Sequence, residues 1–235
     1  MSNLWEGHIR DETMSTVFDI LNAVKIPSGK PLFATQIGSH IWSMQVPGSD
    51  TDLFLCYQIP TTEILASDRT TGRSIFQKFE KEEADVHVSE IATVVHQLIK
   101  NNLNYIVAVM SPLTVMVVDD TLNNLRAFVP RALSQDLFFS FHGMALHNLR
   151  KYTTLWGDNI GMRKLNKIAR VLQMGIALLN GEPEWFAPYE GATVRTIEEM
   201  VVAIKVAKEH SPLPEHCEIK AEMLKWLIDL RLKYL

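Results

Sequence analysis

Over roughly residues 30–118, segments with the apolar pattern of a strand alternate with segments that have the apolar spacing of a helix. The apolar runs Phe33–Ile37 and Thr51–Ile59 have the length and the β-branched and aromatic content of buried strands, and Gly38 ends the first of them. A third, shorter strand is predicted at Asp85–Val88. The pattern therefore predicts a small β-sheet in the first half of the chain.

Helical spacing follows directly after the third strand. Apolar residues recur every three or four positions over Ile91–Ile99, and Asn101 with Asn102 marks the end of that helix. Two further apolar runs, Tyr105–Met110 and Val115–Val118, fit either strands or buried helix segments. Periodicity leaves both alternatives open for these two runs.

The second half of the chain, from about Ser134, has helical spacing almost throughout. Four amphipathic helices are predicted there, at Gln135–Lys151, Met162–Leu179, Val194–Lys208 and Pro214–Tyr234. Gly181 follows the second of them as a candidate C-cap. The change of pattern near Pro130 predicts a first domain over residues 1–130 and a helical domain over residues 131–235. The predicted fold class is α+β, with a small mixed β-sheet and its helices followed by a helical half.

Composition narrows the class of protein. With 47% hydrophobic and 21% charged residues, the chain of 235 residues has the balance of a globular protein with a buried core. A net charge of −4 gives no sign of a polybasic surface that coats nucleic acid, although it is compatible with a local basic patch. Cys56 and Cys217 form no CxxC motif, the first residues lack a signal-peptide pattern, and the apolar runs are too short to span a bilayer. We therefore expect a cytoplasmic protein without a membrane segment.

The stretch that starts at Gly38 carries the clearest chemical pattern. A buried strand leads into Gly38-Ser39, a short turn of helix follows, and the next strand opens with Asp50 and Asp52. Gly38 lets the backbone approach a phosphate group, and Ser39 can either donate its hydroxyl to that group or cap the turn. A helix that begins there directs free N–H groups at the anion. The step from strand to turn therefore predicts a phosphate site.

Carboxylates at the start of two strands predict a metal site. Asp50 and Asp52 are two residues apart on an extended chain, so their side chains share one face, and Mg²⁺ prefers carboxylates together with triphosphate oxygens. Asp85, at the head of the next short strand, is the candidate third ligand and general base, with Glu83 as the alternative. His87 is expected to point away from Asp85 or to lie at the surface.

This arrangement resembles the DNA polymerase β-like nucleotidyltransferase superfamily, in which Gly-Ser, a spacer of about ten residues, Asp-x-Asp and a later strand Asp follow one another. Within it, the chain most resembles the predicted nucleotidyltransferases called RlaP-like. Ser49 to Asp52 is similar to their Ser-Asp-x-Asp, and Asp85–Ile91 to their step from strand to helix. Weaker similarities extend the likeness over residues 31–182, at Asn101–Pro112, around Ser140–Ala145 and at Arg163–Arg170. After Gly-Ser, where the family continues with Arg and an aromatic-Gly pair, this chain has His40, Ile41, Trp42 and Ser43.

The resemblance implies a transferase that moves a nucleoside monophosphate from a nucleoside triphosphate to a hydroxyl of an acceptor by a two-metal mechanism. ATP is the expected nucleotide, and two Mg²⁺ ions are expected at Asp50, Asp52 and Asp85. Arg163, Lys167 and Arg170 fall at positions i, i+4 and i+7, so they share one helix face, which either meets the triphosphate or is solvated. Nucleotide contacts are expected from both halves of the chain: Gly38, Ser39, Ser49, Arg163, Lys167 and Arg170.

Two other classes of function stay open. One is a non-catalytic nucleotide-binding or regulatory module on the same fold, which the loss of Asp85 from the metal geometry would favour. The other is a helical protein-interaction subunit, such as a toxin–antitoxin partner, which rests on the helical second half alone. The sequence leaves the acceptor open among an RNA end, a protein side chain, a small metabolite and an antibiotic, and it does not predict the oligomeric state.

Overall fold

The computed structural model describes residues 12–26, 28–45, 49–66, 74–81, 83–157, 160–182 and 184–233 of the chain. The strands are β1 (Lys30–Ile37), β2 (Thr51–Gln58), β3 (Ser74–Phe79), β4 (Ala84–Glu90) and β5 (Thr114–Val117). The helices are α1 (Glu12–Ala23), α2 (Thr61–Ala66), α3 (Ile91–Ile99), α4 (Leu103–Met110), α5 (Thr121–Ala132), α6 (Leu137–Trp156), α7 (Met162–Leu179), α8 (Val194–Glu209) and α9 (Lys220–Leu232), with a single 3₁₀ turn, η1 (His40–Trp42), after β1.

The described strands form one mixed sheet in the order β3-β4-β2-β1-β5. β2 and β4 run parallel, whereas the other neighbouring pairs are antiparallel. The three predicted strands are confirmed as β1, β2 and β4, and the helix predicted at Ile91–Ile99 is confirmed as α3. β3 has no counterpart among the predicted strands, because its exposed positions mix serine, phenylalanine and lysine and give no clean apolar alternation.

The structure decides the two runs that periodicity leaves open. Val115–Val118 corresponds to strand β5, which pairs with β1 at the edge of the sheet. Tyr105–Met110 belongs to helix α4. Its start is fixed locally, because the side chain of Asn102 accepts a hydrogen bond from the backbone N–H of Asn104 at 3.0 Å and so caps the helix.

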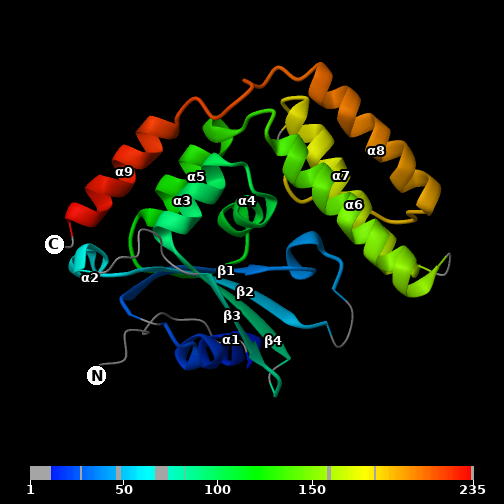
Figure 1. The fold of residues 1–235 in the computed structure, drawn as a ribbon. Helices are drawn as coiled ribbons and strands as arrows, with labels where there is room; N and C mark the ends of the chain where they lie inside the picture. The colour runs from blue at the N-terminus through cyan, green and yellow to red at the C-terminus, as the bar shows by residue number, and fades with distance from the viewer. Residues whose placement is uncertain are drawn as a thin grey trace.

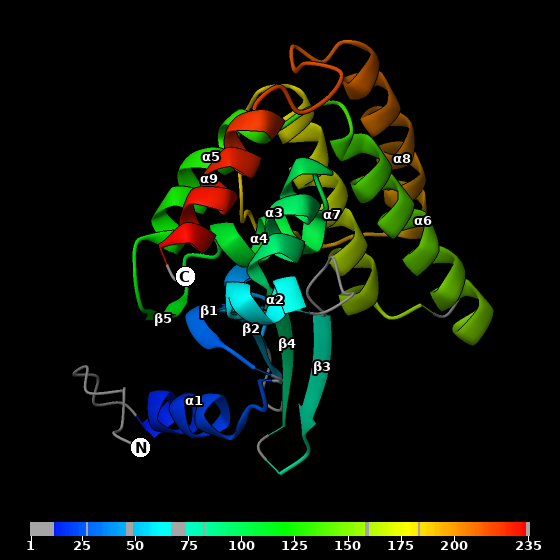
Figure 2. The same ribbon diagram turned by 60° about the vertical axis from the view of Figure 1, so that its left-hand side comes forward.

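The sheet has a different layer of structure on each face. Among the described helices, α1 alone covers one face, and the helices from α3 to α9 lie on the other side (Figure 1 and Figure 2). Alternation along β2 divides its side chains between the two layers. Leu53 and Leu55 pack in the cluster that contains Ile20 of α1, whereas Phe54 and Cys56 pack in the larger cluster with the other helices.

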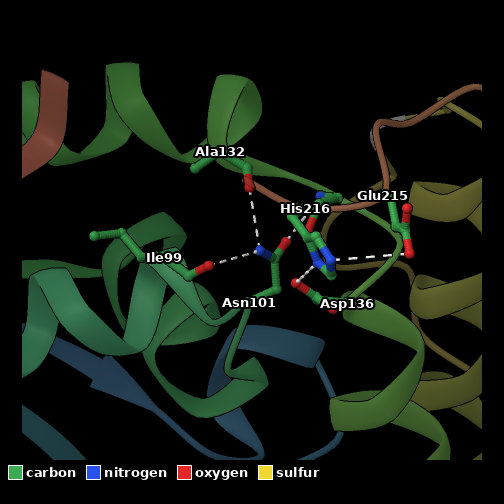
Figure 3. Close-up of polar contacts among 7 residues, drawn as sticks. Ile99, Asn101, Ala132, Asp136, Glu215 and His216 are labelled. Carbon is green, nitrogen blue, oxygen red and sulfur yellow. Dashed lines mark hydrogen bonds and ion pairs between the residues drawn. The ribbon is translucent and has the colours of Figure 1, made fainter. Parts of the chain in front are cut away.

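The larger buried cluster connects the sheet to the whole helical half. It runs from Phe33 of β1 to Leu230 of α9. Buried Asn101 adds polar contacts across the same region, because its side chain donates to the carbonyl of Ala132 at 3.1 Å and accepts from the backbone N–H of Ser134 at 3.0 Å (Figure 3). The division of the chain at residue 130 stays a prediction; Pro130 lies inside α5.

The helical second half agrees with the sequence pattern, with one change. Gly181 ends α7 with a positive φ of 79°, and the N–H groups of residues 181 and 182 return to the carbonyls of Leu178 and Ala177, as in a Schellman cap. The helix predicted at Pro214–Tyr234 begins at Lys220, and its Tyr234 lies outside the described residues. Residues before 220 form a linker instead, which is tied to the start of α6 by the hydrogen bond from the Gln135 N–H to the Pro214 carbonyl. Within the described part of the chain, no helix is long and apolar enough to cross a membrane.

Candidate active site

The sheet brings two of the predicted carboxylates side by side. Asp52 of β2 and Asp85 of β4 are register partners in the parallel pair, so their side chains leave the same face from strands about 4.8 Å apart. Asp50 lies immediately before β2 and is exposed, whereas Asp52 is half-buried. The three carboxylates therefore lie at the same end of two parallel strands, with Asp50 just outside β2.

The pKa of Asp52 is shifted by its burial and by the charged residues around it. Burial raises the pKa of Asp52 above its ordinary value of 3.8, and the negative charges of Asp85 and Asp50 raise it further. The positive charges of Lys167 and His40 act in the opposite direction. Because Asp52 is half-buried and lies near two other negative charges, a bound cation would stabilise its ionised form.

These carboxylates fit a metal ion that is also bound by oxygen atoms of a ligand. Among the described residues, no group of three or more His, Cys, Asp or Glu side chains is arranged to hold a metal ion by itself. Mg²⁺ in nucleotide sites is bound by one or two carboxylates plus phosphate oxygens, and the pair of Asp52 and Asp85 with nearby Asp50 fits that donor set. That these three residues hold Mg²⁺ stays a prediction.

The structure gives a more specific reason for a glycine at position 38 than the sequence does. Its φ is +74°, and a Cβ at this position would lie 1.9 Å from Oδ2 of Asp52. Glycine is therefore required to leave room for the Asp52 carboxylate, and its approach to a phosphate stays a prediction. Ser39 is buried and makes no side-chain cap bond to η1, so the alternative role as a helix cap is not supported. The turn of three residues is too short to provide a helix dipole for an anion.

Helix α7 carries its cations to this end of the sheet. Arg163 donates from Nη2 to Oγ of Ser49 at 2.8 Å, a contact that joins residues far apart in the sequence. Lys167 lies close enough to Asp52 for each charge to act on the pKa of the other. Burial and the charges of Arg163 and Arg170 lower the pKa of Lys167, while Asp52 raises it. The stripe on α7 therefore faces the carboxylates.

Arg170 is the most constrained of the three cations. It is 7% exposed, and burial lowers its pKa to about 10, so it stays charged at neutral pH. Its guanidinium stacks on the ring of Trp42 at 4.3 Å, Nη1 donates to the sulfur of Met44 at 3.4 Å, and Nε has no hydrogen-bond partner among the described residues. Phe186 supports Trp42 edge-on at 5.3 Å, which agrees with a packing role for the aromatic residues after Gly181.

A hollow of about 290 Å³ opens beside Asp52 and Arg170. Residues of the sheet, of η1 and of helices α4, α6 and α7 line this hollow. They are Ile37, Gly38, Trp42, Asp52, Phe76, His87, Leu103, Asn104, Val107, Met144, Arg170 and Val171. The expectation that His87 points away from Asp85 is wrong, because strand residues two apart share a face. His87 stacks under Phe76 of β3, a strand with no sequence signal, so this aromatic part of the site is visible in the structure alone.

The third carboxylate also has a basic neighbour. Nζ of Lys78 lies 3.8 Å from Oδ2 of Asp85, and both side chains are largely accessible to water, so this ion pair contributes little to stability. Glu83, the alternative ligand, is exposed in the turn before β4 with φ of 46°, and its carbonyl accepts the N–H of Thr51 at 2.8 Å. The structure thus places both acids at the same end of β4, with Asp85 directly beside Asp52.

Comparisons with known proteins identify the family of the chain. The RNA repair pathway DNA polymerase beta family matches residues 10–224 of the chain. No curated protein matches it. Among solved structures, the chain is similar to a nucleotidyltransferase-like protein from Exiguobacterium sibiricum 255-15, with 10% identity, a TM-score of 0.33 and coverage of 95% of this chain and 77% of that one. From the family match over nearly its whole length, and in agreement with its Gly-Ser and Asp-x-Asp segments, the chain belongs to the RNA repair pathway DNA polymerase beta family.

Proposed function

We propose that the protein transfers a nucleoside monophosphate from a nucleoside triphosphate, with ATP as the first candidate, to a hydroxyl of an acceptor. Family membership supports the reaction class. The residues that face one another across the site support the nucleotide: carboxylates on β2 and β4, and cations on α7. A magnesium nucleotide carries both charges that such a site needs, because its metal meets the carboxylates and its phosphates meet the cations.

The observation that carries this proposal is the state of Arg170. A buried guanidinium normally has a carboxylate or several carbonyl oxygens as partners, since an unpaired buried charge costs several kcal/mol. Arg170 has a thioether and an aromatic ring instead, and the structure gives it no carboxylate partner among the described residues. It lines the same hollow as Asp52. A phosphate group is the partner that fits this position.

The chemistry follows from the order of groups across the sheet. Asp85 accepts the proton of the acceptor hydroxyl, whose oxygen attacks the α-phosphorus of the nucleotide. The bond from that phosphorus to the bridging oxygen breaks, and pyrophosphate leaves toward the cations of α7. Magnesium, when bound, would neutralise charge on the phosphates and polarise them. Lys167 and Arg170 would stabilise the charge that develops on pyrophosphate.

The nucleotide-binding part of the proposal is tested by removing the cations. The double change Lys167→Ala with Arg170→Ala should weaken the binding of MgATP by about 100-fold or more, because each charged hydrogen bond is worth about 1.5–3 kcal/mol and the two act on one ligand. Calorimetry at two salt concentrations measures this affinity, and the loss should be larger at low salt. The helix content by circular dichroism should not change.

A matched control is available on α8. Lys205→Ala with Lys208→Ala removes two lysines that do not line the site, so it should leave the affinity for MgATP as in the parent. Arg170→Met adds a second check, since it removes an unpaired buried charge and should not lower the free energy of unfolding. Equal MgATP affinity in the α7 double variant and the parent would show that these cations do not contact the nucleotide.

The role of Asp85 is tested by separating binding from transfer. Asp85→Asn should keep most of the affinity for MgATP and reduce transfer about 100-fold, because a general base contributes at least about that factor. Incubation with α-labelled nucleotides, Mg²⁺ and cell extract measures transfer as label gained by an acceptor. Glu83→Gln is the control, with transfer close to that of the parent. If Asp85→Asn transfers label normally and Glu83→Gln does not, the base is Glu83.

A further inference from the structure

Strand pairing fixes two of the three candidate metal ligands and stops short of the third. Asp52 and Asp85 are register partners in the parallel pair of β2 and β4. The backbone of β2 joins its neighbour from Thr51 onward, where the Thr51 N–H donates to the Glu83 carbonyl at 2.8 Å. Asp50 lies before this point and is exposed. It therefore needs a contact outside the sheet if it is to share a metal ion with the other two carboxylates.

Helix α7 provides such a contact. Nη2 of Arg163 donates to Oγ of Ser49 at 2.8 Å, and Ser49 directly precedes Asp50 in the chain. Arg163 is the second residue of α7, so its backbone is fixed by the helix. The hydrogen bond therefore ties the segment that carries Asp50 to a rigid element of the helical half.

The same helix carries the cations that we propose for the phosphates. Lys167 and Arg170 follow Arg163 by about one and two turns, and a helix rises about 1.5 Å per residue, so the three span about 10 Å of one stripe. Arg170 lines the hollow beside Asp52, whereas Arg163 is not part of that lining. Arg163 is thus directed at the segment that carries Asp50, and Arg170 at the hollow.

We propose that Arg163 is a positioning residue, which by holding Ser49 places the carboxylate of Asp50 for the metal ion of the site. This inference rests on the proposed function, and it gives Arg163 and Ser49 a role other than contact with the nucleotide. One helix bears both this hydrogen bond and the phosphate cations, so a nucleotide bound to α7 also fixes the position of Asp50. Metal binding and nucleotide binding then strengthen each other, and this coupling is reciprocal.

A positioning role and a direct contact with the phosphates predict different effects of Mg²⁺. A side chain that binds a phosphate contributes to the affinity for ATP with or without the metal ion. A side chain that places a metal-binding carboxylate contributes only when the metal ion is present. The two roles are therefore separated by the factor by which Mg²⁺ increases the affinity for ATP.

The test measures this factor by calorimetry on the full-length protein, with ATP in excess EDTA and in excess Mg²⁺. Ser49→Ala removes the acceptor of the hydrogen bond and no charge. It should lower the factor about tenfold, as for the loss of one hydrogen bond to a charged group, and leave the affinity in EDTA as in the parent. Ser49→Thr keeps the hydroxyl and should restore the factor.

A double-mutant cycle assigns the effect to the pair. In the background of Arg163→Ala, Ser49→Ala should have no further effect on the factor, because its partner is already absent. Arg195→Ala is the matched control background, since Arg195 is likewise an exposed arginine at the second position of a helix, α8. In that background Ser49→Ala should keep its full effect.

The outcomes keep the two proposals separate. If Ser49→Ala binds MgATP as the parent does, or keeps its effect after Arg163 is replaced, the positioning role is overturned and the proposed function stands. Equal losses in EDTA and in Mg²⁺ would overturn it as well, because they would make Ser49 a phosphate contact. If the parent does not bind MgATP, the proposed function itself fails, and the positioning role with it.

Discussion

Asp52→Asn should abolish nucleotidyl transfer, with a loss of about 1,000-fold or more. Asp52 interacts with both other carboxylates, since it pairs in register with Asp85 and the charges of Asp85 and Asp50 both raise its pKa. Losing a metal-binding carboxylate removes several kcal/mol of charge stabilisation from the transition state. Labelled-nucleotide transfer and calorimetry with MgATP measure the effect, and Asp50→Ala should weaken Mg²⁺-dependent binding as well.

The same change should increase the free energy of unfolding at neutral pH. The pKa of Asp52 is raised in the folded protein, so its protonated form is favoured there and its ionised form opposes folding. In the parent, the stabilisation that comes from protonated Asp52 is present below its ordinary pKa of 3.8. It is lost as the pH rises through the raised pKa of the folded protein. Asparagine cannot ionise, so the advantage of the variant should grow with pH over that window. Urea unfolding at several pH values measures it.

Asp229→Asn is the control for both measurements, because Asp229 is an exposed aspartate on α9, and it should change neither transfer nor the free energy of unfolding at neutral pH. A variant Asp52→Asn that transfers label and binds MgATP as the parent does would remove the carboxylates from the reaction. A variant that is inactive but also much less stable would mean that Asp52 has a structural role instead.

Arg231→Met should lower the free energy of unfolding by about 3–5 kcal/mol, which is the usual effect of breaking a buried ion pair from one side. Arg231 of α9 donates from Nη2 to Oε1 of Glu90 at 2.6 Å and from Nη1 to the carbonyl of Ile59 at 3.3 Å. Glu90 is fully buried and also caps α3 through the N–H of Ala92. Without Arg231, that carboxylate keeps a single hydrogen bond and no counter-charge among the described residues.

An exposed ion pair provides the control for this change. Arg195 and Glu199 are joined at 2.9 Å on the surface of α8, so Arg195→Met should cost no more than about 0.5 kcal/mol. Thermal unfolding should show a drop of roughly 10 °C for Arg231→Met, at 2–4 °C per kcal/mol. The double variant Glu90→Leu with Arg231→Met should recover much of the loss, because neither charge is then left buried alone. Equal effects of Arg231→Met and Arg195→Met would show that the buried ion pair of Arg231 and Glu90 stabilises the fold no more than an exposed pair does.

Part of the site could be predicted because its signals are local. The alternation of a strand fixes which residues share a face with Asp52, although Asp50 lies just before β2, and a helix places Arg163, Lys167 and Arg170 on one stripe by its own geometry. The contrast between strand patterns and helix patterns also predicted the mixed sheet followed by helices. His87 was within reach of the same rule, since it lies two residues after Asp85.

The remainder depended on which segments become neighbours. No local pattern pairs Asp52 with Asp85, because register is set by packing between strands. The contact between Arg163 and Ser49 and the placement of Phe76 beside His87 likewise need strands and helices in position.

The sequence by itself determined the fold class and the family and predicted the carboxylates and cations of the candidate site, because backbone periodicity and motif spacing are properties of the chain. The tertiary structure alone decided that Tyr105–Met110 is a helix, that Gly38 leaves room for Asp52, and that Arg170 is a buried cation without a carboxylate partner among the described residues. Those features depend on burial and on contacts between residues that are distant in the sequence. Desolvation and close packing arise only when the layers come together.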